Sequence, residues 1–448
     1  MQQVSYWNPN EQSAYPMLRG RRNADAVVIG GGFSGLTTAL WLCRSGLRVV
    51  LLEARTLGSG ASSRCAGMVS LSNGLLYHRL EQKRGIGVLN AYVQTQQSAL
   101  RALRELAQDQ ACEWRDIDAH IVSAAQKDDG ALEAEAAAMR RAGVAVGLES
   151  ATQSPLPASQ SIILRDMATL HPAKHLRRMA REGEKLGLKI FEHSRVTALE
   201  TNLAYTERGS VLAPYLVIAT GYPVINTPGW YFLRLVQRQS SLFPLEEAAF
   251  EGMYFDAHGQ YGLRKLREGA LFQLNGGRVG EHARELPTER FAARYAPFLG
   301  GTLPTNAYDG IETYSPDGLP YIGAYSKKTP NLFVAAGYAG RGLLGSMMAA
   351  QAISAKILGL HDEGYAIYAG ARHGMGAEDC KAIVGTASRY VKGLWRVRAP
   401  RCPHMGCKLV YHPQTRLWEC PCHGSRFDDI GHVLNAPAIH DAPIRHRS

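Results

Sequence analysis

The sequence lacks the features that would place the chain in a membrane or on a nucleic acid. None of its apolar runs reaches the roughly eighteen residues that a membrane-spanning helix needs. Residues 1–22 carry Asn, Gln, Glu and Pro and contain no apolar core of the secretory type. No run of Lys or Arg marks a nucleic-acid arm, although the formal net charge is +11. We therefore expect a cytoplasmic protein with no membrane span and no nucleic-acid partner.

Internal repeats, low-complexity tracts and the residue sets of hydrolytic enzymes are also absent. No Ser-His-Asp set and no pair of carboxylates stands out, so the sequence nominates no general base. His171, His258 and His282 are isolated, and we expect each of them to be structural or solvated.

Cysteine is scarce in most of the chain and concentrated in one short stretch. Four of the eight cysteines lie between residues 402 and 422. A cytoplasmic setting disfavours a disulfide framework and favours a metal or redox role for clustered cysteines. The remaining four are expected to be small buried hydrophobes; they are Cys43, Cys65, Cys112 and Cys380.

A glycine-rich turn near the N-terminus predicts a dinucleotide site. Residues 25–32 predict a buried strand, residues 34–46 a helix and residues 48–53 a second buried strand. Gly30, Gly32 and Gly35 form the G-x-G-x-x-G pattern between the first strand and the helix. Glycines here allow a tight turn, close approach to a pyrophosphate and close helix–strand packing. Glu53 ends the next strand, where a carboxylate accepts hydrogen bonds from ribose hydroxyls.

Further patterns predict the remaining elements. We expect helices over 84–112, 128–142 and 173–186, strands over 189–192, 215–219 and 332–336, and a last helix ending near 358. Residues 226–310 are expected to be mostly β, and residues 361–384 to be a linker.

The clustered cysteines alternate with histidines in two loops. Cys402 and His404 form C-x-H, and Cys420 and His423 form C-x-x-H after fifteen intervening residues. Two Cys and two His from two loops suit a Rieske [2Fe–2S] cluster, in which thiolates hold one iron and imidazoles the other. Structural zinc also accepts Cys₂His₂ ligands and is the alternative.

The two loops resemble those of respiratory-type Rieske proteins. In that family a second cysteine pair, here Cys407 and Cys422, forms a disulfide that ties the loops over the cluster, and zinc sites need no such pair. The resemblance also implies that the Ser425 hydroxyl donates to a cluster sulfur. Phe427 stands where the family often has Tyr, so we expect a lower midpoint potential than in those relatives. We expect the short module to pack against the rest of the chain, which would bury part of its surface.

Four blocks resemble the amino-acid-oxidase-like (DAO) family of FAD-dependent oxidoreductases. They span residues 24–68, 215–221, 315–323 and 331–342. The resemblance implies that FAD is the dinucleotide and that glycines after the last core strand approach its ring. The cofactor-binding residues then expected are Gly30, Gly32, Ser34, Gly35, Glu53, Ala54, Arg55, Gly60, Ala61, Ser62, Val196, Gly221, Gly337, Gly340 and Gly342.

The chain departs from this family in two places. Relatives often carry Asn where Cys65 stands; we expect a buried thiol there, with a thioether to the flavin as the alternative. Sarcosine-oxidase-like members bind the substrate carboxylate through a Lys shortly after the glycine-rich turn, where this chain has Leu343 and Leu344. Arg264 and Arg341 are therefore the candidates for a catalytic cation.

Together the two sites predict a converter of electron pairs into single electrons. We expect oxidation of a small amine or amino-acid-like substrate at FAD and transfer through the [2Fe–2S] cluster to an external one-electron carrier. A reductase running in the opposite direction and a non-enzymatic redox sensor are the alternatives.

The expected fold class is α/β, with a Rossmann-like FAD-binding domain, an inserted mixed β-sheet substrate domain and a small C-terminal antiparallel β Rieske module. The expected boundaries are 24–80, 165–225 and 310–360 for the FAD-binding domain, 81–164 and 226–309 for the substrate domain, 361–384 for the linker and 385–448 for the Rieske module.

Overall fold

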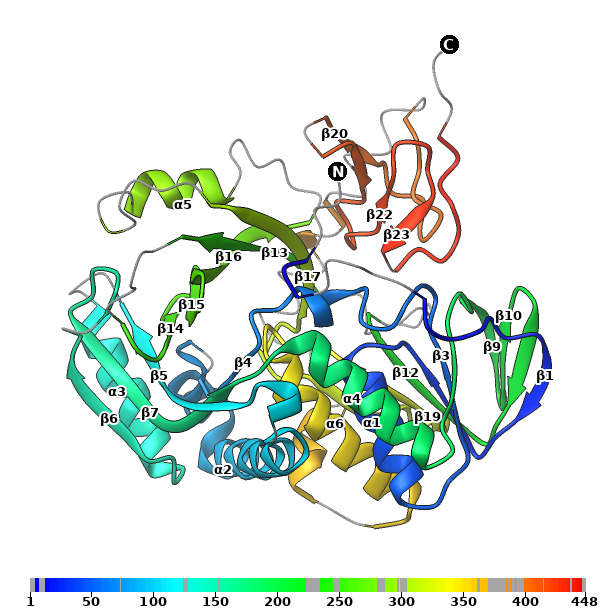
Figure 1. The fold of residues 1–448 in the computed structure, drawn as a ribbon, viewed down its shortest axis with the longest axis horizontal. Coiled ribbons are helices and arrows are strands. Elements are labelled where there is room, and N and C mark those ends of the chain that lie inside the picture. The colour runs from blue at the N-terminus through cyan, green and yellow to red at the C-terminus, as the bar shows by residue number, and fades with distance from the viewer. Residues whose placement is uncertain are drawn as a thin grey trace.

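A computed structural model gives the fold of most of the chain (Figure 1). The described residues are 5–7, 13–72, 74–108, 110–123, 128–151, 154–222, 234–244, 250–279, 287–295, 298, 304–360, 363–369, 384–385, 387–388, 391, 399–413, 415–435 and 437–444. Most of the expected linker lies outside them, as do Cys380 and His282. No helix of the described part is both long and apolar enough to cross a membrane.

A six-stranded sheet forms the centre of the N-terminal domain. Its strand order is β18-β19-β12-β2-β3-β8, and all neighbours except β18 and β19 are parallel. All four residues of β2 and of β3 are buried and apolar, as parallel strands covered on both faces require. The bounds are β2 Ala26–Ile29, β3 Val49–Leu52, β8 Lys189–Phe191, β12 Tyr215–Gly221, β18 Tyr321–Ser326 and β19 Thr329–Ala336.

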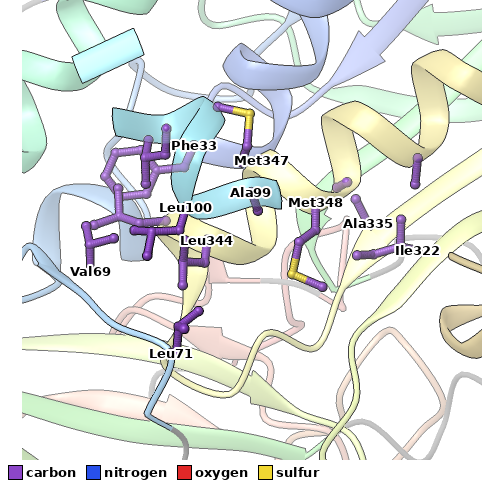
Figure 2. Packing of buried hydrophobic residues seen from close by; sticks show 14 of the residues in the cluster. Phe33, Val69, Leu71, Ala99, Leu100, Ile322, Ala335, Leu344, Met347 and Met348 are labelled. Atoms are coloured by element: carbon purple, nitrogen blue, oxygen red, sulfur yellow. The ribbon is translucent and has the colours of Figure 1, made fainter. Parts of the chain in front are cut away.

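Helices cover one face of this sheet and enclose the main core. The predicted helices appear as α1 (Phe33–Arg44), α2 (Leu76–Ala107), α3 (Asp129–Arg141), α4 (Pro172–Lys185) and α6 (Gly342–Ile357). Figure 2 shows Phe33 of α1, Leu100 of α2 and Met347 of α6 among the packed side chains between the helices. All three are buried side chains of one hydrophobic cluster, which fixes the helices against the sheet.

A second, mixed sheet of nine strands corresponds to the inserted sheet expected from the sequence. Its order is β17-β13-β16-β15-β14-β5-β7-β4, with β6 paired to β7. The pair β14–β5 is parallel and the other pairs are antiparallel, so the sheet is mixed as expected. The bounds are β4 Met68–Val69, β5 Arg115–Val122, β6 Val146–Ser150, β7 Gln160–Thr169, β13 Arg234–Phe243, β14 Met253–Asp256, β15 Tyr261–Leu266, β16 Gly269–Arg278 and β17 Asn306–Tyr314.

Two small sheets complete the described fold. One has the order β1-β11-β10-β9, and the other is the antiparallel C-terminal sheet β20-β21-β22-β23. Figure 1 shows the C-terminal sheet above the N-terminal domain, beside β13 and β17. The bounds are β1 Gly20–Asn23, β9 Val196–Glu200, β10 Leu203–Thr206, β11 Gly209–Leu212, β20 Val410–His412, β21 Leu417–Glu419, β22 Arg426–Phe427 and β23 Val433–Asn435; short 3₁₀ helices lie at Ala61–Arg64, Gln110–Cys112 and Glu363–Tyr368.

The observed elements differ from the expected ones, and the main differences concern α2, α5 and the strands of the mixed sheet. Helix α2 begins at Leu76 rather than near residue 84, and Gly85, with φ of 80°, interrupts it. The stretch expected to be mostly β also contains helix α5 (Pro287–Tyr295). Strands β5 and β7 were not predicted, because the polar residues in both obscure the periodicity of two.

Candidate functional site

The glycine-rich turn between β2 and α1 is a backbone cradle in which side chains have no room. Gly30 has φ of 109°, and a Cβ on it would lie 2.6 Å from the carbonyl oxygen of Ala219. A Cβ on Gly35 would lie 1.8 Å from the carbonyl oxygen of Gly30. A Cβ on Gly32 would lie 2.8 Å from Ser62 Oγ. Because glycine places no side chain at these positions, the N-terminal turn of α1 stays open to a bound phosphate group.

The carboxylate of Glu53 is fixed at the rim of this cradle. It accepts hydrogen bonds from the backbone N–H of Gly31 at 2.7 Å and of Arg55 at 2.8 Å. Both bonds hold the side chain at the end of β3, where the ribose of a dinucleotide bound to the cradle would lie. The predicted role of Glu53 thus fits the observed geometry.

A large cavity extends from the cradle to the substrate sheet. Its volume is about 410 Å³, within the usual range for cofactor and ligand sites. Gly35 and Gly337 do not line it: Gly35 packs on the turn, and the N–H of Gly337 donates to Thr313 Oγ1 at 3.0 Å. The other expected cofactor-binding residues all line the cavity: Gly30, Gly32, Ser34, Glu53, Ala54, Arg55, Gly60, Ala61, Ser62, Val196, Gly221, Gly340 and Gly342.

Two hydroxyl groups join the cradle to the glycine-rich turn after β19. Ser34 Oγ and Tyr338 Oη lie 2.6 Å apart, and both residues line the cavity. Gly345 of α6 makes room for the tyrosine, since a Cβ there would lie 2.2 Å from its ring. Burial raises the pKa of the Tyr338 phenol, so the hydroxyl stays protonated.

The two candidate cations have different surroundings. Arg264 is buried and does not line the cavity; its Nη1 donates to the carbonyl oxygens of Ala66, Gly67 and Leu170 at 3.0 to 3.1 Å. Arg341 lines the cavity, but its Nη1 is buried without a hydrogen-bond partner in the described part of the chain. Its Nη2 lies 3.4 Å from the Gly318 carbonyl oxygen. Arg264 therefore clamps a loop, and only Arg341 reaches the cavity.

Cys65 lies in the wall of the cavity on the loop that Arg264 clamps. Burial raises the pKa of its thiol to about 12, so at neutral pH the thiol is protonated and poorly nucleophilic. Cys65 is thus a protonated thiol, but it is half-buried rather than buried as expected; the thioether stays an untested alternative.

The two cysteine–histidine loops have the same backbone design. In one, the N–H of Cys402 donates to the carbonyl of Cys407 at 2.8 Å; in the other, the N–H of Cys420 donates to the carbonyl of Ser425 at 2.8 Å. Gly406 and Gly424 take positive φ values of 73° and 80° inside these closed turns. The closed turns aim their cysteines and histidines at a common centre.

Four buried sulfurs and two imidazoles meet between the loops. The Sγ atoms of Cys407, Cys420 and Cys422 lie within 4.8 Å of one another. The adjacent Cys420 and burial raise the pKa of the Cys402 thiol. The rings of His404 and His423 have centroids 5.0 Å apart.

The protonation and bonding of these groups fit a metal centre. Burial lowers the pKa of His404 and of His423 to about 4, so both imidazoles are neutral, the form that binds a metal. His404 Nδ1 is buried and has no hydrogen-bond partner among the described residues, as an unfilled metal ligand would. Cys407 and Cys422 are free thiols here, so the disulfide between them stays a prediction.

The C-terminal module forms part of the wall of the large cavity, which local motifs did not indicate. Arg426 of β22 lines it, and an ion pair with Glu419 at 2.6 Å holds its buried side chain. Arg278, at the end of β16, donates from Nη2 to the carbonyl oxygen of Cys422 at 2.8 Å. The residues of the module that line the cavity are Thr415, Leu417, Arg426, Leu434, Asn435, Ala438 and Ile439.

Comparisons with known proteins match both halves of the chain. A family model described as FAD dependent oxidoreductase (DAO) matches residues 25–356, and one described as Rieske [2Fe-2S] domain matches residues 370–445. A putative Rieske 2Fe-2S iron-sulfur protein of Bacillus subtilis, YhfW, is 22% identical over 97% of this chain and 96% of its own length. Gamma-glutamylputrescine oxidoreductase of Escherichia coli is 40% identical over 60 residues, 13% of this chain and 14% of its own.

Two solved structures share the fold of the larger part. Glycine oxidase from Geobacillus kaustophilus matches with a TM-score of 0.65 and 18% identity, over 79% of this chain and 99% of that one. L-proline dehydrogenase from P. horikoshii matches with a TM-score of 0.67 and 17% identity, over 79% and 98%. At these identities the likeness concerns the fold.

Proposed function

Because the chain belongs to the DAO family of FAD-dependent oxidoreductases and carries a C-terminal Rieske [2Fe–2S] domain, we propose that it oxidises a small amine or amino-acid-like substrate and delivers the electrons singly to an external acceptor. When bound, FAD would supply two-electron chemistry and the cluster would supply one-electron transfer. The observation that carries the proposal is the shared cavity, whose walls come from the cradle, the substrate sheet and the C-terminal module.

The arrangement of the module supports an electron route within one chain. Arg278 connects the substrate sheet to the loop of Cys422 through a direct hydrogen bond of 2.8 Å. The carbonyl that accepts this bond lies between the candidate ligands Cys420 and His423. A module held in this way lies beside the cavity, and single-electron transfer between two bound groups requires them to be close together.

The substrate class is supported by the cavity and by the relatives. Phe255 of β14 and Met68 of β4 supply apolar surface, and Gln273 and Glu312 supply polar groups. Such a mixture suits a small molecule with an alkyl part and a polar end. The relatives named for glycine, proline and gamma-glutamylputrescine all act, by their names, on small nitrogen compounds.

An anaerobic stopped-flow experiment on the purified full chain tests the proposal. Amines and amino acids are screened for bleaching of the flavin band, and the cluster signal is followed afterwards. Bleaching followed by cluster reduction is the expected result. Flavin reduction only by a reduced ferredoxin-like donor would replace the proposal with a reductase, and failure of every reductant to couple the two groups would replace it with a redox sensor.

A variant of Arg278 tests the electron route separately. Arg278→Met removes the donor. One such bond contributes about 1 kcal/mol, so the equilibrium between the docked and the undocked module should shift roughly fivefold towards the undocked form, and we expect slower cluster reduction with unchanged flavin bleaching. Arg267→Met is the matched control, because this exposed arginine precedes β16 at its opposite end. Equal cluster reduction in both variants would show that the contact does not hold the route.

A further inference from the structure

The C-terminal module presents one loop to the large cavity, on the side where Figure 1 shows β23 facing the N-terminal domain. We call residues 433–435 and 437–441 the cover loop. Four of its residues line the cavity: Leu434, Asn435, Ala438 and Ile439. We propose that the cover loop binds the adenosine end of FAD, and that FAD and the iron–sulfur cluster therefore stabilise each other's sites. This inference goes beyond the proposed oxidation, since it concerns how the two cofactors are held.

Two hydrogen bonds close the base of the cover loop. The N–H of Val433 donates to Asp441 Oδ1 at 2.8 Å, and the N–H of Ala442 donates to the carbonyl oxygen of Gly431 at 2.8 Å. Glycine is needed at the second contact, because a Cβ on Gly431 would lie 2.3 Å from the carbonyl oxygen of Ala442. A loop closed at its base loses less conformational entropy when it binds a ligand than an open one does.

The hydroxyl of Ser425 connects the cover loop to the loop that carries Cys420 and His423. Ser425 Oγ accepts the N–H of Ala438 at 3.0 Å, and both residues are buried. The carbonyl oxygen of Ser425 accepts the N–H of Cys420 at 2.8 Å. A hydroxyl can accept and donate at the same time, so this contact is compatible with the expected donation to a cluster sulfur. The position of the cavity wall at Ala438 thus depends on the order of the cluster loop.

An ion pair makes a second connection between the cluster loop and the cavity wall. Arg426 of β22 lines the cavity, and its Nε lies 2.6 Å from Glu419 Oε1. The two residues are buried and lie opposite each other in the pairing of β21 with β22. Glu419 directly precedes Cys420 in the chain. A change in the order of the cluster loop therefore reaches the cavity by two routes.

The cover loop ends beside the part of the cavity where the adenosine ribose is expected. Burial and the neighbouring Arg55 guanidinium lower the pKa of Arg195. The carboxylates of Glu53 and Asp441 act on the same guanidinium in the opposite direction, so both lie within electrostatic reach of it. Glu53 is the expected ribose ligand, and Arg195 lines the cavity next to Val196. The cover loop therefore faces the adenosine end of the dinucleotide site.

The side chains of the cover loop suit a flat heterocyclic ring. Leu434 and Ile439 are half-buried apolar residues of the cavity wall, and a ring packed against them would bury more of their surface. Asn435 offers both a donor and an acceptor beside them. Adenine has apolar faces and polar edges, so this mixture of residues matches it.

Binding of FAD and ADP to the full chain tests the proposal, and ADP is the probe for the adenosine end. In one variant Cys402→Ser and His404→Ala are combined, which removes one candidate ligand of each iron. FAD is titrated by flavin fluorescence and ADP by calorimetry, into flavin-free chains with and without the cluster. We expect both ligands to bind the cluster-free chain at least fivefold more weakly. If the two chains bound FAD within twofold of each other, the link between the cofactors would be removed.

A local variant separates the cover loop from the folding of the whole module. Ile439→Ser leaves every candidate cluster ligand in place, so iron and sulfide content should match the wild type while FAD and ADP affinity fall at least threefold. Ile430→Ser is the matched control, because Ile430 belongs to the same module, is 51% exposed and does not line the cavity. Equal affinities in the two variants would contradict binding by the cover loop, and a loss confined to FAD would contradict its place at the adenosine end. If the cluster-free chain does not fold, this pair of variants decides.

The coupling is reciprocal, because it is a free energy shared by the two bound groups. ADP is colourless, so the absorbance of the cluster stays readable when ADP is bound. After equilibration with an iron chelator, the wild type should retain at least twice as much cluster with saturating ADP as without it. Equal retention in both samples would rule out mutual stabilisation.

None of these measurements needs an oxidisable substrate, so the inference and the proposed function fail separately. Weaker FAD binding in the cluster-free chain, without bleaching of the flavin by any amine or amino acid, would keep the inference and remove the proposed oxidation. Bleaching with unchanged FAD affinity in the cluster-free chain would keep the oxidation and remove the inference.

Discussion

Gly35 is the position at which one added methyl group should do the most damage to the dinucleotide cradle. In Gly35→Ala the new Cβ would stand 1.8 Å from the carbonyl oxygen of Gly30. The oxygen belongs to the backbone and the position of a Cβ is fixed by the backbone, so no side-chain rotation relieves the clash. The first turn of α1 must move away from the end of β2, or the turn between them must deform.

The size of the effect follows from this distance. A carbon and a carbonyl oxygen rest about 3.3 Å apart, so the backbone has to open by about 1.5 Å. Overpacking of this kind costs about 1–3 kcal/mol of folding free energy. The displaced part is the helix N-terminus that would bind the pyrophosphate, a contribution of up to about 2 kcal/mol. We therefore expect FAD binding to weaken roughly 5- to 30-fold.

Titration of the apoprotein with FAD, monitored by flavin fluorescence, measures the loss of FAD affinity. Thermal melting of the apoprotein measures the loss of folding stability. Gly87→Ala is the control: Gly87 is exposed on α2, and a Cβ there would meet nothing within 4 Å. Alanine in a helix should stabilise the protein by roughly 0.5–1 kcal/mol and leave FAD affinity unchanged. If Gly35→Ala bound FAD within twofold of the wild type, the assignment of this turn as the phosphate cradle would be refuted.

Three further predictions concern buried groups. Glu135 accepts a hydrogen bond from the N–H of Tyr77, and burial raises the pKa of its carboxyl to about 7. The protonated carboxyl therefore stabilises the fold relative to the ionised one; this contribution is complete below the unfolded pKa of about 4.5 and is lost as the pH rises to about 7. Relative to Glu135→Gln the wild type should therefore lose roughly 3 kcal/mol between these pH values in denaturant titrations, and parallel pH curves would contradict this. Phe427→Tyr should raise the cluster midpoint by roughly 60 mV in a redox titration if its hydroxyl reaches a sulfur, and an unchanged potential would remove Phe427 as the reason for a low midpoint. Tyr338→Phe removes the 2.6 Å contact to Ser34 and should weaken FAD binding roughly fivefold by titration, whereas unchanged affinity would show that the contact does not support the cradle.

The elements near the two motifs were predicted well because short-range patterns specify them. Strands β2 and β3 are continuous apolar runs, and α1 begins directly after the glycines that its packing requires. The strands of the mixed sheet were predicted less well. Its neighbours in space come from distant segments, as β14 pairs with β5 across more than a hundred residues. Pairing of this kind depends on the register of the whole sheet.

The sequence alone determined the chemistry of the two cofactor sites. Each is encoded in one short segment, Gly30 to Glu53 and Cys402 to His423, because local turns and strand ends bring those residues together. It also named two arginines as candidates for a cation, but it carried no information on which carbonyls each would meet.

Only the tertiary structure decided how the sites are combined. In the folded chain Arg264 donates to the carbonyls of a loop almost two hundred residues away, and Glu312 lies beside Gly340 and Gln273. The tertiary structure also closed the dinucleotide cavity with the C-terminal module, through Arg278 and the loop of Cys422. These contacts join segments whose separation in the chain exceeds any local periodicity, so packing and sheet register, rather than motif, determine them.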